Sequence, residues 1–267
     1  PLASALKAKA GEAGRSDAAV LEKKYLTLLE QVWALLPGFC TEPLDMESGL
    51  LANGGQLAKQ MVAVLQGESE LRDYIWVALR RCGDAARQPS SALGQSLQES
   101  NRRCLRTLSN RVMPEMFNVY LKMHSEMEGQ DASRVSFSRQ QALAAIESFS
   151  EVVDSEYVGS LFKSIVAKWL KATTGQGEGT TADDVPALGD LANALVPHLA
   201  AENLELVLRV FAPAIQGGAA EEKILPATQR AGYRALAAVM ANESTAAWPV
   251  SQVTALWRTL QDARQSC

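Results

Sequence analysis

The chain has 267 residues, and its shares of hydrophobic (47%) and charged (21%) side chains are ordinary for a folded soluble domain. A formal net charge of −4 excludes a protein whose whole surface attracts polyanions, so binding to nucleic acid would require a local basic face. No apolar run is long enough to span a membrane. The four cysteines, Cys40, Cys82, Cys104 and Cys267, follow no C-x-x-C spacing and predict reduced core thiols of a cytosolic or nuclear protein.

Helical periodicity covers nearly the whole chain, and Ala and Leu, which are strong helix formers, carry most of the apolar content. Proline and glycine divide the first half, because Pro37-Gly38, Gly67, Gly83 and Gly129 are helix-ending signals. The helices predicted there are 16–36, 45–66, 69–82, 90–109 and 114–129, with Pro114 near the start of the last. In the second half, the predicted helices are 138–153, 155–173, 184–199, 202–217, 221–241 and 250–264.

An internal repeat decides the predicted architecture. One helix carries apolar residues with the spacing i, i+3, i+4, i+7, i+11, and the same spacing returns 46 residues later. The two stripes are Val158, Leu161, Phe162, Ile165, Trp169 and Leu204, Val207, Leu208, Phe211, Ile215. A weaker third copy places Val250, Val253 and Trp257 one period further on. A helix pair that repeats at this spacing is typical of HEAT or armadillo units, whose stacked pairs bury each other's apolar stripes.

We therefore predict an all-α fold, a HEAT/armadillo-type α-solenoid of about five antiparallel helix pairs. It should occupy residues 17–267 as a single solenoid segment, after a flexible N-terminal stretch over 1–16. The regular repeats should lie at about 137–173, 184–217 and 221–264. The run from Ala172 to Asp184 is rich in Gly and Thr and predicts a surface loop.

The segment from Trp33 to Asp45 is the most distinctive local motif. It admits a functional interpretation as a peptide or RNA contact, but a structural one is favoured because Pro-Gly pairs usually serve the backbone. In that interpretation Pro37-Gly38 ends a helix, Phe39 and Cys40 fill the core and Asp45 caps the next helix. The residues assigned to this structural motif are Trp33, Pro37, Gly38, Phe39, Cys40, Pro43 and Asp45.

One stretch concentrates positive charge. Between Glu70 and Val112 there are eight arginines against four acidic residues, a local net charge of +4. Arginine suits phosphate because its planar fork binds two oxygens at once, so contact with an RNA backbone is one interpretation. A solvated helix surface with weak ion pairs is the other, and the residues alone leave both open. The candidate RNA-binding residues are Arg80, Arg81, Arg102, Arg103, Arg106 and Arg111.

The sequence offers no recognisable catalytic set. His124 and His198 are the only histidines, and neither has partners at metal-ligand or triad spacing. The run from Thr174 to Gly179 is rich in glycine but lacks the Gly-Lys-Ser/Thr of a phosphate loop. We expect no enzyme activity, no metal, no cofactor and no small-molecule substrate.

Several blocks resemble a known family in sequence order. WALLPGFCTEPLD (Trp33 to Asp45) resembles the core motif of ribosomal RNA processing protein twelve, and ELRDYIWVALRR and PEMFNVYL resemble the blocks that follow it. LANALVPHLAAENLELVLRVFAPAIQ and QRAGYRALAAV resemble later ones. Members of that family are much longer HEAT-repeat proteins with a lysine-rich tail that this chain lacks, so we expect a fragment.

The resemblance implies a scaffold for ribosome biogenesis. Its partners would be pre-ribosomal particles, with their RNA, assembly factors or ribosomal proteins, during small-subunit maturation and nuclear export. It implies a location in the nucleolus and nucleus, with possible shuttling to the cytoplasm, and a link to the nuclear export machinery. The alternative is a protein-only adaptor, or a solenoid like a nuclear transport receptor. Steep salt dependence of RNA binding would separate the two.

Overall fold

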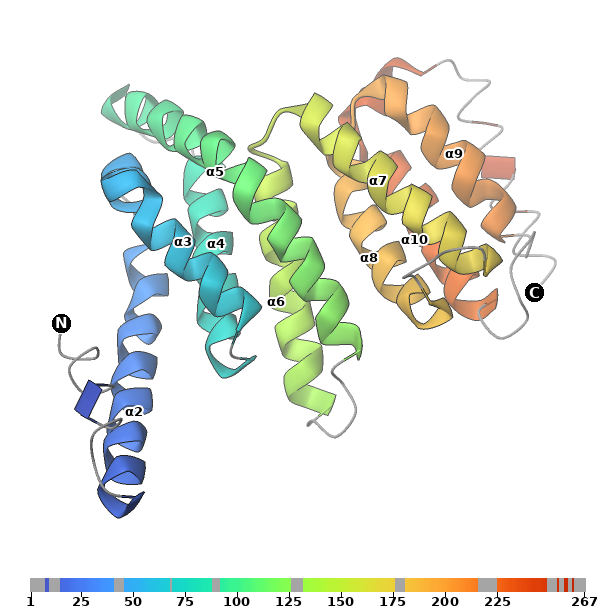
Figure 1. The fold of residues 1–267 in the computed structure, drawn as a ribbon. Helices are drawn as coiled ribbons and strands as arrows, with labels where there is room; N and C mark the ends of the chain where they lie inside the picture. Colours follow the sequence, from blue (N-terminus) through green and yellow to red (C-terminus); the bar gives the residue numbers. More distant parts are fainter. Residues whose placement is uncertain are drawn as a thin grey trace. The chain divides into compact units, whose positions relative to one another are not determined.

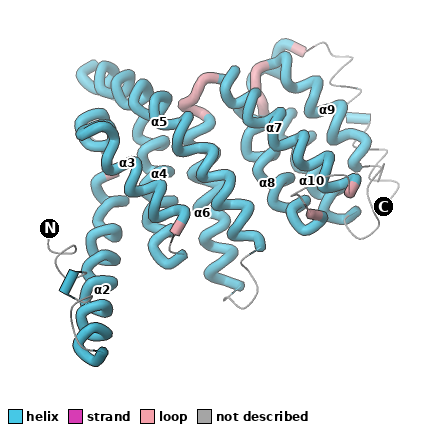
Figure 2. Tube along the Cα trace, viewed as in Figure 1, coloured by secondary structure: helices cyan, strands magenta, loops and turns pink. Residues whose placement is uncertain are grey.

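The structure is a computed structural model that describes residues 8–9, 15–40, 46–67, 69–87, 92–125, 132–175, 181–215, 225–248, 254, 257–258 and 261. Within these ranges every regular element is a helix and no strand occurs, as Figure 2 shows. The predicted all-α class is therefore confirmed. None of the described helices combines the length and the apolar character that crossing a membrane requires.

The chain divides into two compact units, Pro1–Cys104 and Leu105–Cys267. Helix α5 (Ala92–Ser125) contains the boundary, so it contributes residues to both units. A single solenoid segment over 17–267 stays a prediction.

The first unit holds α2 (Arg15–Phe39), a π-helical turn (Glu47–Leu51), α3 (Ala52–Gln66), α4 (Ser69–Arg87) and the start of α5 (Figure 1). Helices α2 and α3 both pack against α4. The core of this unit includes Leu65, Ile75 and Trp76, each fully buried. Burial of such large apolar side chains is the main favourable contribution to folding, so α4 is the central helix of the unit.

Three helix boundaries in this region differ from the prediction. Helix α2 continues through Pro37 to Phe39, and α4 continues past Gly83 to Arg87. Proline removes only one backbone donor, and the amide of Cys40 still donates to the Leu36 carbonyl at 3.1 Å. Gly83 is buried inside α4, where packing offsets the modest helix cost of glycine.

The third difference is a kink. Inside the first turn of α3, Asn53, Gly54 and Gly55 have φ angles of 52°, 68° and 74°. Glycine adopts this left-handed region without steric cost, and asparagine tolerates it better than most residues. The predicted continuous helix over 45–66 is therefore interrupted at these three residues.

Helix α5 joins two helices that were predicted separately, 90–109 and 114–129. Pro114 lies inside it, where it leaves one carbonyl of the preceding turn without its helical donor. Its neighbours Val112, Met113 and Met116 are at most 3% exposed. Their burial compensates the lost hydrogen bond, so the helix runs through the proline.

The described part of the second unit contains five further α-helices after its part of α5: α6 (Ala132–Ser150), α7 (Ser155–Thr174), α8 (Val185–Leu195), α9 (Ala201–Ile215) and α10 (Leu225–Ala241). Three 3₁₀ turns accompany them, at Ala182–Asp184, Val196–His198 and Glu243–Ala247. Helix α8 packs against α6, α7 and α10, and α9 packs against α10. These helices match the predicted positions within a few residues, except that the predicted start of α6 lies six residues too late.

The 46-residue repeat is visible in the burial of the second unit. Ile165 of α7 and Phe211 of α9 occupy equivalent stripe positions, and both are buried. The ring of Trp169 lies 4.9 Å from the ring of Phe211, so the two stripes meet side by side. The weaker third copy is wrong at Trp257, which is 56% exposed. A stripe residue is buried only where a following helix stacks on it. Val250 and Val253 lie outside the described residues.

Candidate nucleic-acid interface

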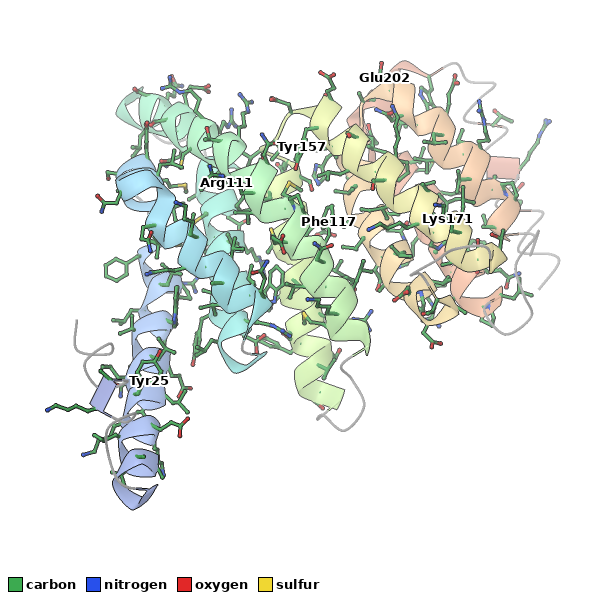
Figure 3. All side chains as sticks on the ribbon, in the orientation of Figure 1. Tyr25, Arg111, Phe117, Tyr157, Lys171 and Glu202 are labelled. Carbon is green, nitrogen blue, oxygen red and sulfur yellow. The ribbon has the colours of Figure 1, made fainter. Side chains whose placement is uncertain are left out.

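The six candidate arginines lie on two helices. Arg80 and Arg81 belong to α4, and Arg102, Arg103, Arg106 and Arg111 belong to α5 (Figure 3 labels Arg111). Three of the six donate hydrogen bonds to backbone carbonyls at the ends of other helices. This role was absent from both interpretations that the sequence left open.

Two such contacts hold the first unit together. Arg81 of α4 donates from Nη1 to the Pro37 carbonyl at 2.7 Å, near the end of α2. Arg102 of α5 donates from Nε to the Ala86 carbonyl at 3.0 Å, in the last turn of α4. Arg72, outside the candidate set but 4% exposed, does the same for α3 by donating from Nε to the Leu65 carbonyl at 2.8 Å.

A fourth contact belongs to the second unit. Arg106 donates from Nε to the Val152 carbonyl at 3.2 Å, just beyond the end of α6, and pairs with Asp154 at 3.4 Å. Both side chains of that ion pair are largely exposed, so the pair itself contributes little stability.

The physical reason is the same at each helix end. The last four carbonyls of a helix have no partner within it, and the C-terminus carries a partial negative charge. An arginine supplies both a donor and a positive charge there. Some of the arginines between Glu70 and Val112 therefore have a structural role, because they join neighbouring helices.

Arg80 is also engaged locally, because its Nε lies 3.6 Å from Asp84, one turn further along α4. Arg87 pairs with the same carboxylate. These exposed pairs along one helix are worth a few tenths of a kcal/mol each.

The positive surface that remains lies on α5. Ten described side chains between Gln95 and Lys122 are exposed, and they include four basic residues but only one acidic residue, Glu99. Of the four, Arg103 lies in the first unit, and Arg106, Arg111 and Lys122 lie in the second; we call these last three the α5 basic surface. Arg106 belongs both to this surface and to the helix-end contacts, because it is exposed and also donates to the Val152 carbonyl.

The segment from Trp33 onward has a mixed outcome. Trp33 and Cys40 are 8% and 6% exposed, as expected for core residues, but Phe39 is 74% exposed. The expectation that Phe39 fills the core is wrong, because α2 continues to this residue and directs its side chain away from Trp33 and Cys40. Pro37 is buried and Gly38 exposed, while Pro43 and Asp45 lie outside the described residues.

The buried thiols behave as the composition predicts. Cys40, Cys82 and Cys104 are buried and take part in no disulfide. A hydrogen bond with Cys40, together with burial, holds the pKa of the Cys82 thiol well above its usual range. This thiol therefore stays protonated at neutral pH and has little nucleophilic character.

A polar cluster in the second unit was missed from the sequence. Asp190 of α8 accepts hydrogen bonds from Tyr120 of α5 (3.0 Å), Arg139 of α6 (3.2 Å) and Arg234 of α10 (2.7 Å). Burial and the Asp190 charge raise the pKa of Tyr120. One carboxylate thus connects four helices. The partners lie 44 to 70 residues away in sequence, so no local pattern indicates them.

The fold and this surface define a class: an α-helical repeat protein of the HEAT type that presents charged side chains on packed helices. Residues 1–123 match the family model described as "Ribosomal RNA-processing protein 12, HEAT repeats". The match agrees with the predicted HEAT-type solenoid, and it supports the resemblance to the family that the motifs indicated.

Two curated relatives are similar over longer stretches. The RRP12-like protein of Homo sapiens is 28% identical over 172 residues, which cover 64% of this chain and 12% of the relative. The RRP12-like protein of Gallus gallus is 26% identical over 221 residues, which cover 81% of this chain and 15% of the relative. The chain therefore spans only a small part of the length of the curated relatives that it matches.

Proposed function

We propose that this chain is a non-catalytic HEAT-repeat scaffold of ribosome biogenesis. The observation that carries the proposal is the match of residues 1–123 to a family named for ribosomal RNA processing. Stacked helix pairs suit this role because they offer an extended surface on which many modest contacts add up. The expected site of action is the nucleolus and nucleus, with shuttling to the cytoplasm during export of the small-subunit precursor.

We further propose that the α5 basic surface contacts the phosphates of pre-ribosomal RNA. Arg106 and Arg111 are exposed arginines of this surface. Their guanidinium groups can bind two phosphate oxygens at once. Arg102 and Arg106 already donate from Nε to carbonyls, so they would contact phosphate only through their other guanidinium nitrogens. Proteins of the same pre-ribosomal particle would occupy the remaining surface.

A protein-only adaptor is the second candidate. It is favoured by one observation, namely that Arg81, Arg102 and Arg106 already donate to carbonyls within the chain. Fewer cations are then fully available for phosphate than the sequence count suggests.

Binding to a single-stranded RNA oligonucleotide, followed by fluorescence anisotropy between about 50 and 200 mM salt, tests the proposal. The informative variant is Arg111→Gln with Lys122→Gln, because it removes two exposed positive charges from the α5 basic surface. We expect weaker binding and a salt slope reduced by about 0.7 for each phosphate that the variant no longer neutralises. The matched control is Arg209→Gln with Arg230→Gln, which removes two exposed cations from α9 and α10.

Equal reductions in affinity for the variant and its control would contradict the assignment to α5, since they would show a response to net charge alone. Absence of RNA binding by the unmodified chain at low salt would remove the RNA contact and favour the adaptor. Thermal melts of all three proteins show whether weaker binding reflects unfolding.

A further inference from the structure

Helix α7 carries positive charge along its exposed side. Lys163, Lys168 and Lys171 are exposed there, and Figure 3 labels Lys171. None of the ion pairs among the described residues involves these three side chains. The acidic residue of α7 is Glu156 in the first turn, where it complements the helix dipole. Three lysines and no acidic residue after that turn give a local charge of +3, and we call the three the α7 lysines.

The charge of α7 contrasts with that of its equivalent in the next repeat. The charged residues that α9 exposes are Glu202, Glu205 and Arg209, two acids against one arginine, so its net charge is −1. The whole chain is also negative, with a formal net charge of −4. The positive charge of α7 is therefore local, as a binding surface for an anion requires.

The 46-residue repeat that relates α7 to α9 also extends back to α5. Four residues in the second half of α5 lie 46 positions before four residues of the α7 stripe, and each of them is at most 6% exposed. The pairs are Val112 and Val158, Met116 and Phe162, Val119 and Ile165, and Met123 and Trp169. The second half of α5 and α7 therefore occupy equivalent places in successive repeats.

Equivalent residues of stacked repeats lie in a row across the helices. Lys122 of α5 and Lys168 of α7 are 46 positions apart and both are exposed, so they belong to one such row. The ion pair between Arg106 and Asp154, the residue before α7, also brings the two helices together. Packed helices are about 8–10 Å apart, so the α5 basic surface and the α7 lysines are neighbours on the second unit.

A surface rich in lysine suits a polyanion better than a folded protein. Lysine is depleted from the buried centres of protein interfaces, where aromatic residues usually supply the anchors. The aromatic residues of α7 are Tyr157, Phe162 and Trp169, and none of them is exposed. Its exposed large apolar side chain is Leu170, which is 42% exposed. A phosphate backbone, in contrast, is bound by flexible point charges such as lysine ammonium groups.

Further repeats of a longer chain would not cover the α7 lysines. A solenoid grows at its two ends, because each repeat contacts only its neighbours. Helix α7 already has a neighbour on both sides, since its Trp169 ring contacts Phe211 of α9 and the preceding Asp154 pairs with Arg106 of α5. Its exposed side is therefore not a surface on which another repeat stacks.

We propose that the α7 lysines extend the RNA contact of α5, so that one RNA strand crosses both helices. The inference rests on the proposed RNA contact of the α5 basic surface, and it adds the direction of the strand and one end of its path. The path ends before α9, where the exposed charge becomes negative. The contacts are to phosphate, so they position the strand without selecting a base sequence.

Fluorescence anisotropy with a labelled single-stranded RNA, repeated between about 50 and 200 mM salt, tests the inference. The informative variant is the triple Lys163→Gln, Lys168→Gln and Lys171→Gln. The matched control removes three exposed lysines from α2 and α3 of the first unit, Lys23→Gln, Lys24→Gln and Lys59→Gln. Lysine and glutamine have similar helix propensities, and thermal melts check that each variant stays folded.

We expect the α7 variant to bind RNA more weakly, with a salt slope reduced by about 0.7 for each lysine that contacts phosphate. The control should change both quantities clearly less. Titration to saturation should give one RNA strand per chain, because a single strand occupies both helices.

Three results would overturn the inference. Two RNA strands per chain, or an α7 variant that binds as tightly as its control, would overturn it while the α5 contact stays in place. Absence of RNA binding by the unmodified chain would remove the α5 contact as well. A poly-glutamate peptide is the second probe: if the α7 variant loses this peptide and keeps its RNA affinity, the α7 lysines bind an acidic protein segment instead.

Discussion

The packing of Phe211 offers the most direct test of the repeat architecture. Its side chain is fully buried in α9, and its ring lies 4.9 Å from the Trp169 ring at an interplanar angle of 41°. The backbone next to it is equally constrained, because a Cβ placed at Gly232 of α10 would lie 3.0 Å from the Phe211 carbonyl oxygen. The three helices therefore have little freedom to close a gap at this position.

The substitution Phe211→Ala should lower the free energy of unfolding by about 3–5 kcal/mol. The tilted contact with Trp169 contributes about 0.5–1.5 kcal/mol of this beyond the buried area. Poor relaxation around the tight α9–α10 contact leaves a cavity, which places the expected effect in the upper part of the range.

Urea unfolding followed by circular dichroism measures the effect, with Leu208→Ala as the control. Leu208 lies on the same helix but is only half-buried, so its truncation should cost clearly less. A decrease below about 1 kcal/mol for Phe211→Ala would refute the stacked stripes. So would equal decreases for the two variants.

Three further predictions concern other contacts. Arg102→Ala should cost about 1 kcal/mol in urea unfolding, because the α4 carbonyl loses its donor, while Arg111→Ala, at an exposed position of the same helix, should change stability by less than about 0.5 kcal/mol; equal effects would refute the helix-end role. The pKa of Tyr120 is raised in the folded chain, so its stabilising contribution is present below about pH 10 and is lost as the pH rises further. Tyr120→Phe should therefore make the free energy of unfolding fall less steeply with pH above about pH 10. An unchanged pH dependence of the free energy of unfolding would contradict the assignment. Gly189→Ala should lower the melting temperature, because the new Cβ would lie 2.8 Å from a side chain of α10, whereas Gly38→Ala meets nothing within 4 Å and should be neutral or stabilising; a stabilising Gly189→Ala would show that α8 and α10 are not in close contact.

The local hydrophobic periodicity was sufficient to predict the helices of the second unit. The stripe from Val158 to Trp169 predicted α7 within a residue or two, because a period of 3.6 residues is a property of the helix itself. The 46-residue recurrence predicted that α7 and α9 are equivalent, since equivalent stripes must be buried in equivalent ways. The resemblance to a ribosomal RNA-processing family followed from motifs that are contiguous in sequence.

Only the tertiary structure decided where helices end and what the arginines do. Pro37, Gly83 and Pro114 read locally as helix ends, yet the helices continue because their neighbours are packed in the core. Arg102 and Arg106 meet carbonyls 16 and 46 residues away. A local sequence pattern cannot predict these contacts. A hydrogen bond between two helices depends on the positions of both helices and not on the residue spacing along either one.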